Sequence, residues 1–175
     1  FQMLHLLTAK PVLYTCNVEE KAAATGNNFS RDVEAMAAEQ GAKAIIISAE
    51  IEEEIAQLTD VEERLGFLET LSLRETGLTR VIRAGYHLLD LITFFTSGPK
   101  ETRAWTILEG ARAPAAAGAV HSDFENGFIK AETISYNDFI KFEGEIGAKD
   151  AGKMRQEGKE YLVADGDVLL FRFNV

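Results

Sequence analysis

Two short, continuously apolar segments in the first part of the chain, Val12–Cys16 and Lys43–Ser48, have the pattern of buried β-strands. Between them, apolar positions at helical spacing predict a helix over Ser30–Gln40, which Gly41 ends. Strands that are apolar throughout, rather than alternating, are typical of a parallel sheet covered on both faces. A strand, a helix and a second strand in this order predict a parallel βαβ unit with a right-handed crossover.

Helical spacing continues after the second predicted strand. Three further helices are predicted: one over Ala49–Leu58, one that begins at residues 59–62, and one over Leu78–Leu89. The composition then becomes rich in β-formers, beginning with Leu91–Thr96. We therefore place a domain boundary near Tyr86–Asp90.

The part after this boundary is predicted to combine strands with one small-residue helix. Leu91–Thr96 and Glu101–Leu108 form a hairpin through the turn at residues 98–99, and Pro114 is placed as the first residue of a short helix within the small-residue stretch 113–120. Three further strands are predicted, the last two paired about the turn at 165–167: Phe128–Ile134, Tyr161–Ala164 and Val168–Phe173. Residues 144–157 are polar and loosely helical. A hairpin, a helix and a second hairpin are the layout of a β-grasp (ubiquitin-like) domain.

Charge and cysteine content narrow the class of protein. The 175 residues carry a formal charge of 18 − 28 = −10, which argues against broad binding to naked nucleic acid, and we expect no sequence-specific DNA partner. The single cysteine, Cys16, excludes an internal disulfide and fits a reducing cytoplasm. No apolar run reaches transmembrane length, so no membrane partner is expected. Because the chain begins at Phe1 within an apolar run, we interpret it as a fragment cut within a helix.

Polar residues follow both predicted parallel strands, where open α/β sheets bind ligands. The segment Asn17-Val18-Glu19-Glu20 follows the first strand, and Ser48-Ala49 follows the second. The asparagine amide and a backbone N–H of the second turn could contact the edge of a purine base. The spacing alone favours a simpler interpretation, in which Asn17 is a turn residue and Ser48 an N-cap.

Other candidate residues have a structural interpretation that is favoured over the functional one. The spacing of His121, Asp123 and Glu125 fits no common zinc pattern, so a capped turn is preferred to a metal site. Trp105 could stack RNA bases together with Phe124 and Phe128, but all three suit the core of a small β-domain better. Cys16 is expected to be a core residue, and the acidic run Glu50–Glu54 a solvated helix face.

Four blocks of sequence resemble one family of proteins. They are LLTAKPVLY…NVEE; IIISAEIEEEI; RAGYHLLDLITFFTSGPKETRAWTILEGARAPAAAGAVHSDFENGFIKAE; and EGKEYLVADGDVLLFRFNV. Together they look like the carboxyl-terminal half of the Obg-like ATPases, the YchF subfamily of P-loop GTPase-related proteins. The resemblance implies four parts: residues 1–9 end a helical insertion, 10–60 are the C-terminal part of a G domain, 61–88 are connecting helices, and 89–175 are a TGS domain. The fold class is then an α/β remnant of a P-loop G domain followed by an α+β β-grasp domain.

The resemblance also implies a role for the residues at the strand ends. Asn17–Glu20 takes the position of the Asn-Lys-x-Asp motif with which GTPases recognise guanine. A longer Glu20 can turn away from adenine, which leaves Asn17 and the backbone of Val18 to hold the base; Ser48 and Ala49 form the second base-contacting loop. This agrees with the preference of the family for ATP over GTP. The family hydrolyses ATP with Mg²⁺, is cytoplasmic and associates with ribosomes.

The sequence has no Gly-x-x-x-x-Gly-Lys-[Ser/Thr] motif, which cradles the phosphates in P-loop enzymes. We expect the fragment to be inactive alone, because neither phosphate nor Mg²⁺ has its binding residues here. Within the TGS domain, Arg103, Arg112 and Lys130 are the candidate contacts to ribosomal RNA or protein. The alternative is a free-standing TGS-type module that binds RNA or the ribosome and has no nucleotide function.

Overall fold

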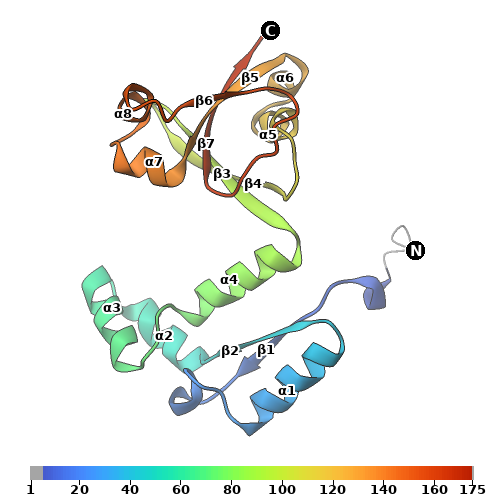
Figure 1. Cartoon of the computed structure of the whole chain (residues 1–175). Coiled ribbons are helices and arrows are strands. Elements are labelled where there is room, and N and C mark those ends of the chain that lie inside the picture. The colour runs from blue at the N-terminus through green and yellow to red at the C-terminus, as the bar shows by residue number, and fades with distance from the viewer. Residues whose placement is uncertain (1–5, 175) are drawn as a thin grey trace. The chain divides into compact units, whose positions relative to one another are not determined.

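The computed structural model describes residues 6–174, which form two compact units divided between Leu89 and Asp90 (Figure 1). This division lies inside the segment 86–90, where the change of pattern had suggested a boundary. Residues 1–5 of the expected insertion helix lie outside the described part. Leu7–Ala9, which the same interpretation assigned to that helix, form a short 3-10 helix (η2).

The first unit is built on two parallel strands, β1 (Leu13–Asn17) and β2 (Lys43–Ile47), as the sequence predicts. The helix between them, α1 (Asn28–Glu39), begins with a reciprocal capping box in which Asn27 and Ser30 each accept the other's backbone N–H. It contacts both strands, as does α4 (Gly77–Leu88). The register places Asn17, the last residue of β1, beside Ile47, the last residue of β2.

Two further helices, α2 (Ala49–Gln57) and α3 (Val61–Thr70), complete this unit. Asp60 caps α3, since one of its carboxylate oxygens accepts hydrogen bonds from the N–H groups of Glu62 and Glu63 at 2.7 and 3.1 Å. A small apolar core lies between the helices and comprises Ala23, Ile51, Ile55, Leu68 and Leu73.

The second unit contains a five-stranded mixed sheet in the order β4-β3-β7-β5-β6. Its strands are β3 (Leu91–Ser97), β4 (Thr102–Leu108), β5 (Phe128–Ser135), β6 (Arg155–Glu157) and β7 (Asp167–Phe173). The predicted β3–β4 hairpin is confirmed over its whole length. The central strand β7 runs antiparallel to β5 and parallel to β3.

Helices cover both faces of this sheet. The helix α5 (Ala113–Val120) buries the fully inaccessible Ala113, Ala116 and Ala117 in a core with Phe94 and Phe171. Small side chains let the helix lie close to the strands, and α6 (Ser122–Asn126) follows it directly. The helices α7 (Tyr136–Lys141) and α8 (Glu145–Asp150) pack on a second apolar cluster. It includes strand residues that are sequence neighbours of strand residues in the first core. Because successive residues of a strand point to opposite faces of the sheet, the two clusters lie on opposite faces.

The predicted second hairpin is wrong. Tyr161–Ala164 forms no strand with β7, and its one bridge joins Leu162 to Arg112. The N–H groups of Ala113 and Val163 instead tie this segment to the start of α5, donating to the carbonyls of Tyr161 and Ala111 at 2.9 and 3.0 Å. The turn still begins β7, but the partners of β7 are distant in sequence.

Residues 144–157, expected to be loosely helical, divide into α8 and the edge strand β6. The architecture is thus mixed α/β with one parallel and one mixed sheet.

Candidate functional site

The residues that follow β1 and β2 meet at one edge of the parallel sheet. Asn17 Oδ1 accepts a hydrogen bond from the backbone N–H of Ala49 at 2.9 Å. Ala49 is the first residue of α2, so this N–H has no partner within the helix. The side chain that ends one strand therefore fixes the start of the helix that follows the other.

Ser48 occupies the N-cap position of α2 but does not cap it with its side chain. The residue is 2% exposed, and its Oγ is buried without a hydrogen-bond partner. The simpler interpretation from sequence is thus right about the N-cap position, but the side chain that accepts a helix N–H belongs to Asn17. A buried hydroxyl without a partner is costly, and such groups are often satisfied by a ligand or water.

Val18 and Glu20 differ in what they offer a ligand. Val18 is 7% exposed, and its N–H donates to the carbonyl of Ile47 at 2.9 Å. Only its carbonyl therefore remains as a polar group for a base. Glu20 is exposed and begins the short 3-10 helix η3 (Glu20–Ala22).

An open hollow of about 320 Å³ lies beside β1. It is lined by the strand from Tyr14 to Val18 and by residues at the start of α1, including Asn27 and Phe29. Phe29 is 80% exposed, which is unusual for so large an apolar side chain. Nothing in the sequence pattern had singled out Asn27 or Phe29, because their part in the hollow depends on how α1 packs beside β1.

Of the residues expected to contact a base, Asn17 and Val18 line this hollow, whereas Glu20, Ser48 and Ala49 do not. With Oδ1 of Asn17 engaged by Ala49, its Nδ2 is left to donate outward, and Ser48 Oγ lies unsatisfied at the same edge. Among residues 6–174 there is no group of His, Cys, Asp and Glu side chains that could hold a metal ion. The chain also lacks the P-loop sequence that binds phosphates.

The three basic residues expected to contact the ribosome do not gather on one face. Each has an acidic partner: Arg103 with Glu101 at 3.2 Å, Arg112 with Glu160 at 3.1 Å and Lys130 with Glu132 at 3.6 Å. Arg103 is on β4, Arg112 precedes α5 and Lys130 is on β5, and the strands β3 and β7 separate β4 from β5.

The remaining candidates have mainly structural roles. His121 Nδ1 accepts a hydrogen bond from Asp123 N at 3.1 Å and so caps α6. Phe128 is 5% exposed within the core. Trp105 is partly buried; its Nε1 donates to Thr96 Oγ1 at 2.9 Å, and the Arg103 guanidinium lies 5.2 Å from its ring centre.

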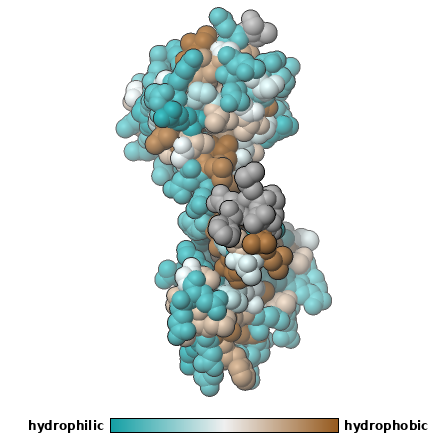
Figure 2. Space-filling view, turned by 90° about the vertical axis from the view of Figure 1, so that its right-hand side faces the viewer, coloured by the Kyte–Doolittle hydropathy of each residue, from teal (hydrophilic) through white to brown (hydrophobic). Residues whose placement is uncertain are grey.

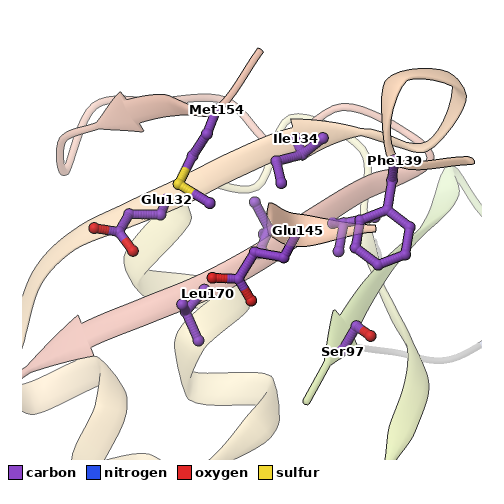
Figure 3. Close-up of a pocket in the computed structure, with 9 residues that line it drawn as sticks. Ser97, Glu132, Ile134, Phe139, Glu145, Met154 and Leu170 are labelled. Carbon is purple, nitrogen blue, oxygen red and sulfur yellow. The ribbon is translucent and has the colours of Figure 1, made fainter. Parts of the chain in front are cut away.

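A small pocket under α7 and α8 contains two carboxylates, from Glu132 and Glu145 (Figure 3). Its volume of about 10 Å³ is no larger than one water molecule needs. Arg172 donates to Glu132 Oε2 at 2.8 Å, and this hydrogen bond lowers the pKa of Glu132. The pocket is therefore too small for a nucleotide.

None of the helices formed by residues 6–174 combines the length and the apolar character needed to cross a bilayer.

One family model and several curated proteins match this chain. The family model YchF-GTPase_C, described as a protein of unknown function (DUF933), matches residues 91–174. The Ribosome-binding ATPase YchF of Haemophilus influenzae is 55% identical over 171 residues, which are 98% of this chain and 47% of the relative. The protein of the same name from Bacillus subtilis is 52% identical over 99% of this chain and 48% of that relative.

Two solved structures are also similar. The Schizosaccharomyces pombe YchF GTPase has a TM-score of 0.83 at 35% identity, covering 97% of this chain and 45% of that one. A GTP binding protein from Pyrococcus horikoshii OT3, with a TM-score of 0.64 at 19% identity over 94% of this chain and 46% of its own, supports the fold alone. The chain spans about half the length of the relatives it matches. It belongs to the YchF family, and it corresponds to the carboxyl-terminal region of that family.

Proposed function

We propose that this chain supplies the base-binding edge of the nucleotide site in a cytoplasmic, ribosome-associated ATPase. The observation that supports this most directly is the hydrogen bond from Ala49 N to Asn17 Oδ1. It joins the two loops that follow parallel strands, the part of an α/β sheet where nucleotides bind. It also orients the Asn17 amide, because an occupied oxygen leaves the amide nitrogen as the group that faces a ligand.

The proposed base contacts are Asn17, Val18, Glu20, Ser48 and Ala49. The Asn17 amide donates to a ring nitrogen of the purine, and the Val18 carbonyl accepts from the 6-amino group of adenine, where guanine carries a carbonyl oxygen instead. Glu20 leaves room for this amine. ATP is therefore the proposed nucleotide, with phosphates and Mg²⁺ held by residues outside this chain.

The second unit is proposed to be a TGS domain of β-grasp type that docks on the ribosome. The support is its mixed sheet with α5 packed against one face, together with the name Ribosome-binding ATPase that the relatives carry. The proposed contacts are Arg103, Arg112 and Lys130. On docking, each would exchange its glutamate partner for a group of the ribosome.

The test is nucleotide binding by the longest natural form of the protein, measured with a fluorescent ATP analogue and with GTP as competitor. Replacing Asn17 by Ala removes one hydrogen bond to the base and should weaken ATP binding about tenfold, since a net loss of about 1.4 kcal/mol is a factor of ten. Asn126→Ala, in an exposed position of α6, is the matched control and should leave ATP binding unchanged.

Equal ATP affinity for Asn17→Ala and the control would refute the base-binding role. Co-sedimentation of the same protein with ribosomes tests the docking role separately. If ribosomes bind a protein whose ATP binding is insensitive to all five residues, the free-standing binding module is the better account.

A further inference from the structure

The mixed sheet of the second unit opens between two of its strands. Within residues 6–174, β3 and β7 pair at one position only, Phe95 with Val168. Beyond it β3 continues to Ser97 and β7 continues to Phe173. In contrast, β7 pairs with β5 along almost its whole length. Half of β7 therefore has a partner on one side only.

The backbone of β7 shows which groups face this opening. Hydrogen-bonded positions alternate along an antiparallel pair. Tyr136 N donates to Gly166 O at 3.0 Å, so the alternation directs residues 168, 170 and 172 toward β5. The N–H and C=O groups of Phe171 and Phe173 then point to the β3 side, past the single pairing. They form a short strand edge inside the sheet.

Hollows lie on both faces of this opening and share Ser97, Leu169 and Leu170 in their linings. The larger, of about 370 Å³, is on the side of α5 and α6. The smaller lies under α8, and Figure 3 shows Ser97 and Leu170 on the two strands that bound it.

The larger hollow is apolar and aromatic at its base. Trp105 and Val120 line it together with Phe124 and Phe173, whose rings stack at 3.9 Å between centroids. An apolar side chain entering here would bury its surface against these rings. On the face shown in Figure 2 the surface is mostly hydrophilic, with separate hydrophobic patches.

The charges at the opening favour a basic occupant over a nucleic acid. Glu101 lines the larger hollow and Glu145 the smaller, both on exposed positions. The nearby cations Arg103 and Arg172 already pair with Glu101 and Glu132 at 3.2 and 2.8 Å, so neither is left unpaired to attract phosphates. The chain as a whole carries a net charge of −10.

We propose that this opening, which we call the β3/β7 groove, binds a short extended peptide segment of a protein partner that alternates basic and apolar residues. The segment adds main-chain hydrogen bonds to the free edge of β7 at Phe171 and Phe173 and places an apolar side chain beside Trp105 and Phe124. Main-chain pairing supplies affinity in such strand addition, and pockets for alternate side chains supply specificity. The groove goes beyond the proposed nucleotide site and does not depend on it.

The test begins with a phage-displayed library of random peptides of about a dozen residues, selected on the full 175-residue chain. An enriched peptide is then titrated into ¹⁵N-labelled protein. The amide signals of Ser97, Phe171 and Phe173 should shift and saturate together. The same peptide N-methylated at alternate residues cannot donate the main-chain hydrogen bonds, and its affinity should fall at least about tenfold.

Two variants separate the groove from the general surface. Phe173→Lys places a positive charge at the groove and should weaken peptide binding at least about tenfold. Ile129→Lys, at a residue 52% exposed on β5 outside the groove, should change it less than about twofold. If Phe173→Lys does not fold, the N-methylated peptide still decides the question.

Three outcomes would overturn the proposal. The library yields no binder; the enriched peptides shift amides elsewhere; or N-methylation leaves affinity unchanged. A uridine oligonucleotide that shifts the groove amides when the peptides do not would identify the site as an RNA site instead.

Discussion

The sequence pattern gave no indication of the contact that Glu52 makes with the start of α4. The acidic run 50–54 reads as a solvated helix face, but the Glu52 carboxylate accepts hydrogen bonds from Gly77 N at 2.6 Å and Leu78 N at 3.1 Å. These are the first two residues of α4. Thr76 Oγ1 accepts from Thr79 N at 3.1 Å, so the leading N–H groups of α4 all have acceptors.

The expected cost of removing this carboxylate follows from what it contacts. Hydrogen bonds to a charged group contribute about 1.5–3 kcal/mol when buried, and a negative charge at a helix N-terminus about 0.3–1 kcal/mol. Glu52 is partly exposed, so we expect Glu52→Ala to cost about 2 kcal/mol in total. Glu52→Gln keeps one acceptor and should cost about 1 kcal/mol.

Native-state hydrogen exchange is the appropriate assay, because it reports α4 separately from the second unit. A loss of about 2 kcal/mol corresponds to roughly thirtyfold faster exchange of the α4 amides. Glu53→Ala, on an exposed position of the same helix, is the matched control and should change exchange less than about twofold. If Glu52→Ala and Glu53→Ala exchange alike, the carboxylate does not hold the start of α4 and the reasoning fails.

Four further predictions concern other parts of the chain. Asp167, 3% exposed, accepts from Tyr161 OH at 2.7 Å and Ala164 N at 3.0 Å; Asp167→Asn should cost about 2–3 kcal/mol in urea unfolding followed by Trp105 fluorescence. Burial, followed by the neighbouring Asp167, raises the pKa of Tyr161 from 10.0 to about 12, so the native state keeps a proton that the unfolded state loses. The contribution of this tyrosine to stability is then complete below pH 10 and lost as the pH rises toward 12, and a melting temperature that falls no faster in wild type than in Tyr161→Phe would contradict this. Glu20→Asp should raise the affinity of the longest natural form for GTP relative to ATP, since a shorter carboxylate suits the N–H donors of guanine; an unchanged ratio counts against the proposed role of Glu20. The 175-residue chain alone should show neither ATP turnover nor micromolar ATP binding, because the phosphates have no binding residues in it; calorimetry and phosphate release decide this.

The local pattern predicted the elements that depend on neighbours in sequence. The strands β1 and β2, the helix between them and the β3–β4 hairpin follow from apolar runs, from Gly41 and from the turn at 98–99. Pro114 is the second rather than the first residue of α5, a difference of one position. The convergence of Asn17 and Ala49 was also predictable, because parallel strands end at the same edge of a sheet.

The sequence could not determine the contacts between distant segments, because the local pattern of a segment does not indicate which other segment it will contact. Tyr161–Ala164 has the composition of a strand, but β5 lies along one side of β7 and β3 pairs with Val168 on the other, at the end of β7 next to the turn, so this segment does not pair there. Asn17 rather than Ser48 caps α2, and Glu52 holds α4 across 25 residues of sequence. The β3/β7 groove arises because the two strands diverge after one pairing. Periodicity fixes which face of an element is apolar, whereas pairing partners, register and caps supplied from afar are decided only when the tertiary structure brings those elements together.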